Sequence, residues 1–175
     1  MNKKLLESTK LALEMEKKGY DLYTKHARET DQPVMSSIFL GIAERELKHI
    51  ERIETLYNEA SKENINYKLI EDLTLPIDRK ELLSGILAKL QEHLKEKPSH
   101  KISDSYKPAL ALEKDSYEYY KKLAAEADDS IVKKFFEVLS KEENEHYSIL
   151  LESQHYLDKP DEWFHKQERW IVEGG

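Results

Sequence analysis

The chain of 175 residues contains no cysteine. Disulfides, thiolate metal ligands, iron–sulfur clusters and cysteine nucleophiles are therefore excluded within these residues. Any metal ion that the chain binds must be held by oxygen and nitrogen atoms. Glycine and proline, the residues that most often interrupt helices, are scarce, with five of each. Their scarcity, together with 36 % charged residues, is typical of long amphipathic helices and predicts an all-α protein.

The chain also lacks a basic run and a long apolar segment. Its formal net charge of -7 disfavours a nucleic-acid partner, because such a surface would repel phosphates. No apolar stretch approaches the roughly 20 residues that a membrane span needs. The first residues turn polar at Glu7 instead of continuing into the apolar part of a secretory signal. We therefore expect one soluble, cytoplasmic domain over residues 1–175, with no nucleic-acid or membrane partner.

The most informative feature of the sequence is a set of residues that recurs 97 positions later. The first copy is Glu16, Tyr20, Tyr23, Glu46 and His49, and the second is Glu113, Tyr117, Tyr120, Glu143 and His146. Internal self-similarity of this kind usually reflects a duplicated structural unit. The repeated residues include four carboxylates and two imidazoles, which is the set that a two-metal site inside a helical bundle requires.

Apolar residues at helical spacing predict a first helix pair at about residues 3–62. Asp31 followed by Pro33 predicts an N-cap with proline in the first turn of the second helix. The short loop between the two helices makes them antiparallel neighbours.

The second pair is predicted at about residues 103–157. The Asp-Asp-Ser sequence at 128–130 supplies the turn and the cap between its helices. Pro108 predicts that the third helix either begins or bends there, because an interior proline removes a backbone hydrogen bond and crowds the preceding turn.

The crossover between the pairs, at about residues 63–102, is too long for a structureless loop. Asp78 and Glu81 resemble a capping box, and the apolar stripe that follows predicts an additional helix that ends before Pro98. The tail at residues 158–175 contains both tryptophans of the chain. We expect this aromatic tail to dock on the bundle or on a partner subunit.

The repeated carboxylates and imidazoles predict a metal centre. Residues three apart share a helix face, so Glu46 with His49, and Glu143 with His146, can each direct two ligands at one spot. Glu16 and Glu113 lie on the apolar stripes of the other two helices, where a lone ionised carboxylate would cost several kcal/mol or become protonated. Two divalent cations would cancel the four carboxylate charges. We predict these ligands: Glu16, Glu46, His49, Glu113, Glu143 and His146.

Oxygen and imidazole ligands suit iron or manganese, and zinc is a further alternative. The competing interpretation is that duplication preserved polar residues that face water or pair with lysine. It is disfavoured because Glu46 and His49 lie between Ile42 and Ile53, on the side of the helix that must be buried.

Other histidines and the tyrosines have simpler interpretations. Glu-x-x-His also occurs at His155 and His165, but neither has a counterpart 97 residues earlier, so we interpret both as chance pairs. Three histidines without matching partners are interpreted as surface residues: His26, His93 and His100. For the four repeated tyrosines we favour core packing, and the alternative is a hydroxyl that hydrogen-bonds a ligand carboxylate.

The segments Glu16-Lys-Lys-Gly-Tyr-Asp-Leu-Tyr23 and Glu113-Lys-Asp-Ser-Tyr-Glu-Tyr-Tyr120, each followed by its Glu-x-x-His, resemble the rubrerythrin branch of the ferritin-like superfamily. The resemblance implies an antiparallel four-helix bundle with a long crossover. It also implies a non-haem centre of two iron ions held by the six residues named above. The implied activity is oxidation of ferrous iron by hydrogen peroxide or dioxygen.

The chain departs from the best-known rubrerythrins in two ways. They have a further glutamate one turn after the third-helix ligand, which can exchange with a histidine, whereas this chain has Ser116. They also carry a cysteine-rich rubredoxin domain that supplies electrons. The resemblance therefore implies an external electron donor, such as a rubredoxin-type protein, and it favours a homodimer.

Three functions follow as alternatives. The leading one is a di-iron oxidoreductase of peroxidase or ferroxidase type. The second is a non-catalytic protein that binds, buffers or senses iron. The third is an interaction module in which a metal only stabilises the fold.

Overall fold

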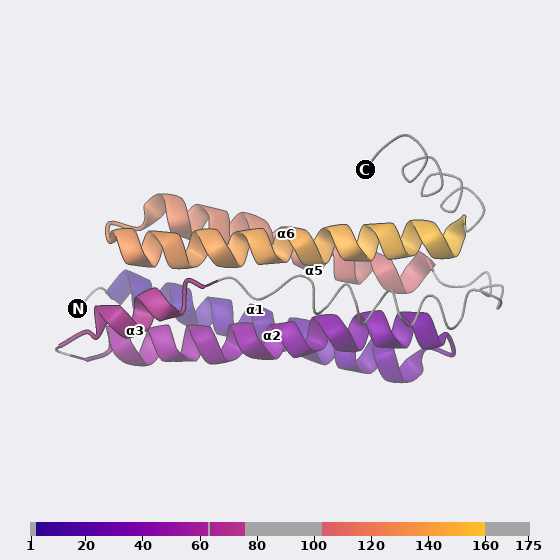
Figure 1. Ribbon diagram of the computed structural model, residues 1–175, viewed down its shortest axis with the longest axis horizontal. Coiled ribbons are helices and arrows are strands. Elements are labelled where there is room, and N and C mark those ends of the chain that lie inside the picture. The colour runs from indigo at the N-terminus through magenta and orange to yellow at the C-terminus, as the bar shows by residue number, and fades with distance from the viewer. Residues whose placement is uncertain (1–2, 63, 76–102, 160–175) are drawn as a thin grey trace.

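The computed structural model describes residues 3–62, 64–75 and 103–159, and Figure 1 shows their arrangement. Within these ranges the secondary structure is entirely helical, as the composition predicts. The helices are α1 (Lys3–Glu29), α2 (Pro33–Ala60), α3 (Tyr67–Asp72), α5 (Ser103–Glu126) and α6 (Ser130–Asp158). No helix in the described ranges is long and apolar enough to cross a membrane.

The four long helices form two antiparallel pairs. In Figure 1, α1 and α2 form one layer, and α5 and α6 lie against it as the other. Helices pack most closely within each pair, and the pairs meet where α1 lies on α5 and α2 lies on α6. The chain therefore forms the predicted four-helix bundle, in which the two repeats are the two halves.

The start of α2 differs from the prediction. The N-cap is Gln32, not Asp31, and its side chain makes no capping hydrogen bond. Pro33 occupies the first helical turn, where its missing N–H leaves no donor unsatisfied. The hydroxyl of Thr30 accepts a hydrogen bond from the Gln32 N–H at 3.2 Å, so the polar residue that organises this turn stands one position before Asp31.

The second pair begins and turns largely as predicted. The carboxylate of Asp129 accepts hydrogen bonds from the N–H groups of Ile131 and Val132 at 2.8 and 3.1 Å, which caps α6. Pro108 lies inside α5, five residues after its start at Ser103, so the helix does not begin at the proline.

Helix α3 is absent from the sequence-based predictions. It is only six residues long, which gives periodicity little to detect. Its cap is conventional, because the side chain of Asn66 accepts a hydrogen bond from the Leu69 N–H at 3.2 Å. Ile70 is buried, and α3 packs against α6 and α2. The predicted helix after Asp78 and the aromatic tail from residue 160 onward, with His93, His100 and His165, lie outside the described residues, whereas Asp158, the first residue of the predicted tail, ends α6.

Two apolar clusters fill the bundle and leave a polar layer between them. One cluster contains Phe39 and Tyr106, and the other contains Phe135 and Phe136. Along α2, the first cluster ends at Ala43 and the second begins at Ile53. The same alternation holds on α1, α5 and α6, so each long helix passes from one cluster to the other across the layer that contains the repeated Glu and His residues.

Candidate metal centre

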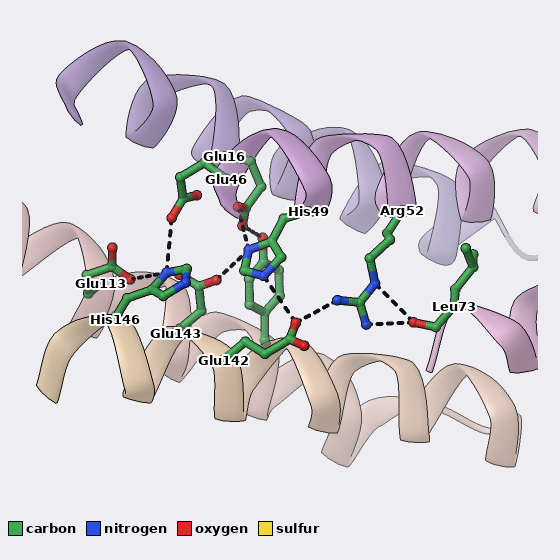
Figure 2. Close-up of polar contacts among 10 residues, drawn as sticks. Glu16, Glu46, His49, Arg52, Leu73, Glu113, Glu142, Glu143 and His146 are labelled. Atoms are coloured by element: carbon green, nitrogen blue, oxygen red, sulfur yellow. Dashed lines mark hydrogen bonds and ion pairs between the residues drawn. The ribbon is translucent and has the colours of Figure 1, made fainter. Parts of the chain in front are cut away.

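All six predicted ligand residues meet in the polar layer of the bundle. Each long helix brings its own members there: Glu16 on α1, Glu46 and His49 on α2, Glu113 on α5, and Glu143 and His146 on α6. None of the six is more than 3 % exposed. The Glu-x-x-His spacing places each imidazole one helical turn from its carboxylate, so both point into the bundle (Figure 2).

The six side chains form two overlapping groups of four. One group is Glu16, Glu46, His49 and Glu143, and the other is Glu46, Glu113, Glu143 and His146. Within each group the potential ligand atoms all lie within 4.8 Å of one another. Glu46 and Glu143 belong to both groups, whereas each group has its own histidine and its own third glutamate. The arrangement follows the repeat, because the 97-residue offset exchanges one group for the other.

The Nδ1 atoms of both histidines face the carboxylates. His49 Nδ1 lies 3.1 Å from Glu16 Oε2 and 2.9 Å from Glu143 Oε1. His146 Nδ1 lies 3.2 Å from Glu46 Oε1 and 3.5 Å from Glu113 Oε2. The two imidazole rings are stacked, with centroids 5.4 Å apart and an interplanar angle of 20°. Each imidazole therefore presents the same nitrogen to the oxygen atoms of its own group.

Two of the four repeated tyrosines contact the site. The hydroxyl of Tyr23 donates a hydrogen bond to Glu113, and the hydroxyl of Tyr120 donates one to Glu16. Both rings are fully buried and belong to the apolar clusters, so they pack in the core and also bind carboxylates. Tyr20 and Tyr117 are only partly buried, and within the described residues neither hydroxyl forms a hydrogen bond with a ligand carboxylate.

Charge repulsion and burial divide the metal-free site into protonated and ionised groups. Burial raises the pKa of Glu46 well above its usual range, and the nearby Glu16 and Glu143 raise it further. Burial also raises the pKa of Glu143, with Glu16 and Glu113 adding to the effect. These two carboxyl groups, which both ligand groups share, therefore favour the protonated form when no cation is present.

The pKa values of Glu16 and His49 shift in the direction opposite to the one that burial alone would cause. Burial alone would raise the pKa of Glu16, but attraction to His49 and hydrogen bonds with Glu46, His49 and Tyr120 lower it to about 2. Burial would lower the pKa of His49, but Glu16 and Glu143 outweigh it and raise this pKa well above the usual value. In the metal-free protein an imidazolium thus partly replaces the positive charge that the carboxylates require.

The donor set suits a pair of divalent cations. Glu46 Oε1, Glu113 Oε2 and the two ring nitrogens of His146 are buried, and none of these four atoms makes a hydrogen bond in the described structure, although His146 Nδ1 lies close to both oxygens. Buried polar atoms normally make a hydrogen bond, and several neighbouring ones that make none are compatible with ligation of an ion. Four carboxylates and two imidazoles, with two carboxylates shared, fit two ions whose charges would cancel those of the four glutamates.

Sequence reasoning missed a second layer of polar residues behind His49. His49 Nε2 lies 3.1 Å from Glu142 Oε2, and Arg52 Nη1 donates to the same oxygen at 2.6 Å. Arg52 is held in turn by the carbonyl of Leu73, which accepts from Nε at 3.0 Å and from Nη2 at 2.6 Å. The available signal was that Glu142 is adjacent to Glu143, but a chain this rich in glutamate offers many such neighbours.

The remaining histidines in the described ranges lie outside both groups. His155 is half-buried near the end of α6, and the Glu152 that precedes it is exposed. The interpretation of His26 as a simple surface residue is incomplete, because its ring lies 5.6 Å from that of Phe39 and its Nε2 is buried.

The sequence was also compared with known protein families, curated proteins and solved structures. The rubrerythrin family matches residues 7–154, a range that contains both helix pairs and all six residues of the centre. No curated protein and no solved structure matches the chain.

Proposed function

Because the chain belongs to the rubrerythrin family, we propose that it is a non-haem di-iron oxidoreductase that reduces hydrogen peroxide or dioxygen while ferrous iron is oxidised. The observation that carries this proposal is the pair of overlapping four-residue groups that share Glu46 and Glu143. Either group alone offers four ligand atoms to one ion, so the second group, with its own histidine and its own glutamate, supports a second ion.

In this proposal Glu16 and His49 would hold one ion, Glu113 and His146 would hold the other, and Glu46 and Glu143, which belong to both groups, would be ligands available to either ion. When bound, two ferrous ions supply the two electrons that cleave the O–O bond of hydrogen peroxide, and with two protons the products are two water molecules. The four glutamates supply the negative charge that neutralises the ions, and the burial of all six ligand residues keeps bulk water away. Tyr23 and Tyr120 orient Glu113 and Glu16 through their hydrogen bonds.

The alternative is that the same six residues bind manganese or zinc instead of iron. Sustained turnover would require an external electron donor, such as a rubredoxin-type protein, because these 175 residues contain no cysteine for a built-in iron–thiolate donor. The homodimer and the cytoplasmic location expected from the sequence stay predictions.

The test begins with metal analysis of the purified protein and continues with anaerobic loading of ferrous iron. Addition of hydrogen peroxide is then followed by absorbance. We expect about two iron ions per chain and rapid oxidation that consumes about one peroxide for every two ions. Glu46→Ala and Glu143→Ala serve as site variants, and Glu137→Ala, an exposed position on the same helix as Glu143, is the control.

Each outcome separates the alternatives. Two ions with fast peroxide-driven oxidation support the oxidoreductase. Two tightly held ions that do not respond to peroxide or dioxygen favour the non-catalytic metal-binding alternative. Full retention of two irons in Glu46→Ala would overturn the assignment of the site.

A further inference from the structure

The two halves of the centre are duplicated in their ligands but not in what lies behind the histidines. Behind His49, the carboxylate of Glu142 lies 3.1 Å from Nε2. Behind His146, Nε2 is buried and makes no hydrogen bond within the described chain. The residue that the 97-position offset pairs with Glu142 is Arg45, and a guanidinium cannot accept a hydrogen bond from an imidazole.

Glu142 is itself held firmly. Its side chain is only 5 % exposed, and Arg52 Nη1 donates to its Oε2 at 2.6 Å. Arg52 is anchored from the other side, because Nε and Nη2 both donate to the Leu73 carbonyl at the end of α3. Its guanidinium also lies over the ring of Phe135 at 5.9 Å. Figure 2 shows the resulting line from Leu73 through Arg52 and Glu142 to the outer nitrogen of His49.

A carboxylate on the outer nitrogen of a metal-bound histidine has a known physical effect. It fixes the tautomer and the ring orientation, and it increases the electron density that the inner nitrogen donates to the metal. His49 Nδ1, which faces Glu16 and Glu143, would therefore be the stronger electron donor to a bound ion. No described residue places a carboxylate on His146 Nε2, so His146 Nδ1 would lack this effect.

We propose that Glu142, held by Arg52, positions the His49 imidazole so that the Glu16–His49 half of the centre binds its divalent ion more tightly than the Glu113–His146 half. This inference rests on the proposed two-metal site. Glu142 and Arg52 are positioning residues in it, since neither belongs to a ligand group. The centre therefore fills in a defined order, although its six ligands are duplicated.

The test is a titration of the metal-free protein with Co²⁺ alone, followed by the visible absorbance of the bound ion and by equilibrium dialysis. The wild-type chain is expected to bind two ions in two steps of different affinity. Glu142→Gln keeps the shape and removes the charge, and it is expected to weaken the tighter step by about 10–100-fold while the weaker step changes less. Glu137→Gln removes one exposed charge from α6 and should leave both steps unchanged.

A double-mutant cycle assigns the affected half. In a His49→Ala background, Glu142→Gln should have no further effect on the remaining ion, because Glu142 acts through His49. In a His146→Ala background, it should still weaken the remaining ion. If Glu142→Gln leaves Arg52 too poorly paired for the protein to fold, Glu142→Gln combined with Arg52→Gln removes both charges and is expected to show the same selective loss.

Two results overturn the inference alone: two wild-type steps of equal affinity, or a Glu142→Gln variant whose two steps shift equally or not at all. Failure of the wild-type chain to bind two ions would instead refute the proposed function, and the inference with it.

Discussion

The hydroxyl of Tyr120, on α5, donates a hydrogen bond to Glu16, on α1. The repeat supplies the reciprocal bond, because Tyr23 on α1 donates to Glu113 on α5. Each half of the bundle therefore orients a carboxylate of the other half. These bonds cross the contact between α1 and α5, so the geometry of the centre depends on the association of the two helix pairs.

Tyr120→Phe is expected to lower the free energy of unfolding of the metal-free protein by about 1.5–3 kcal/mol, the usual range for a hydrogen bond to a charged group. The ring would still fill the core, but Glu16 would lose a buried donor. Urea denaturation with a chelator present measures the change. Tyr117→Phe is the control, because the Tyr117 hydroxyl accepts only a long, exposed hydrogen bond from Lys121 Nζ, at 3.4 Å, and should contribute little. Equal effects from the two variants would contradict the assignment.

Glu46 and Glu16 should differ in how many ions they affect. Glu46 belongs to both four-residue groups, whereas Glu16 belongs to one. Glu46→Gln is therefore expected to weaken the binding of both ions, and Glu16→Gln mainly that of one. Metal analysis after dialysis against a fixed concentration of ferrous iron, without oxygen, measures the stoichiometry. Glu143→Gln should behave like Glu46→Gln and Glu113→Gln like Glu16→Gln, and the reverse pattern would show that the shared ligands are wrongly identified.

The metal-free protein is expected to lose stability as pH rises from about 5 to 8. Glu46 and Glu143 have raised pKa values in the fold, so their protonated forms stabilise the protein below the unfolded value of 4.5, and this contribution is lost as pH rises. His49 acts in the same direction above 6.5. Glu16, with its pKa lowered to about 2, acts oppositely but only below pH 4.5.

The expected slope is about 1.4 kcal/mol per pH unit for each additional proton that the folded chain holds. Urea denaturation at several pH values with a chelator measures it. A variant with both Glu46→Gln and Glu143→Gln should show a flatter dependence, because the amides do not titrate. A stability that rises over this pH range would show that the shared carboxyl groups are ionised in the metal-free fold.

The bundle and the cluster of six residues could be predicted because both depend on short, regular spacings. Glu46 and His49 share a helix face whatever the rest of the fold does, and the 97-residue repeat showed which Glu-x-x-His pairs belong together. His155 has the same local spacing but no counterpart 97 residues earlier, and it belongs to neither ligand group.

Features that depend on tertiary contacts could not be predicted in this way. The contact of Arg52 with Leu73 joins two helices through a backbone carbonyl, and no side-chain pattern encodes it. The crossed bonds of the tyrosines require the relative placement of α1 and α5. The cap of α2 was wrongly assigned to Asp31 because local propensity identifies suitable residues near a helix start but not the one whose backbone adopts the cap conformation.

Gly19 provides the last prediction, because it leaves room for a shared carboxylate. An added Cβ there would lie 3.1 Å from Glu46 Oε2 and 3.3 Å from Glu46 Cδ. Replacing glycine by alanine inside a helix usually stabilises it by about 0.5–1 kcal/mol. For Gly19→Ala we expect part of this gain to be lost and metal binding to weaken by roughly tenfold, because Glu46 must shift away from its place in both ligand groups.

Gly41→Ala is the matched control for Gly19→Ala, since it adds the same methyl group to the interior of α2 outside both ligand groups. It should leave the affinity for Co²⁺ unchanged. Urea denaturation of the metal-free variants and Co²⁺ titration measure the two effects separately. If Gly19→Ala binds both ions with wild-type affinity, Glu46 can serve both ligand groups from a shifted position, and Gly19 then serves the packing of α1 against α2 and not the geometry of the centre.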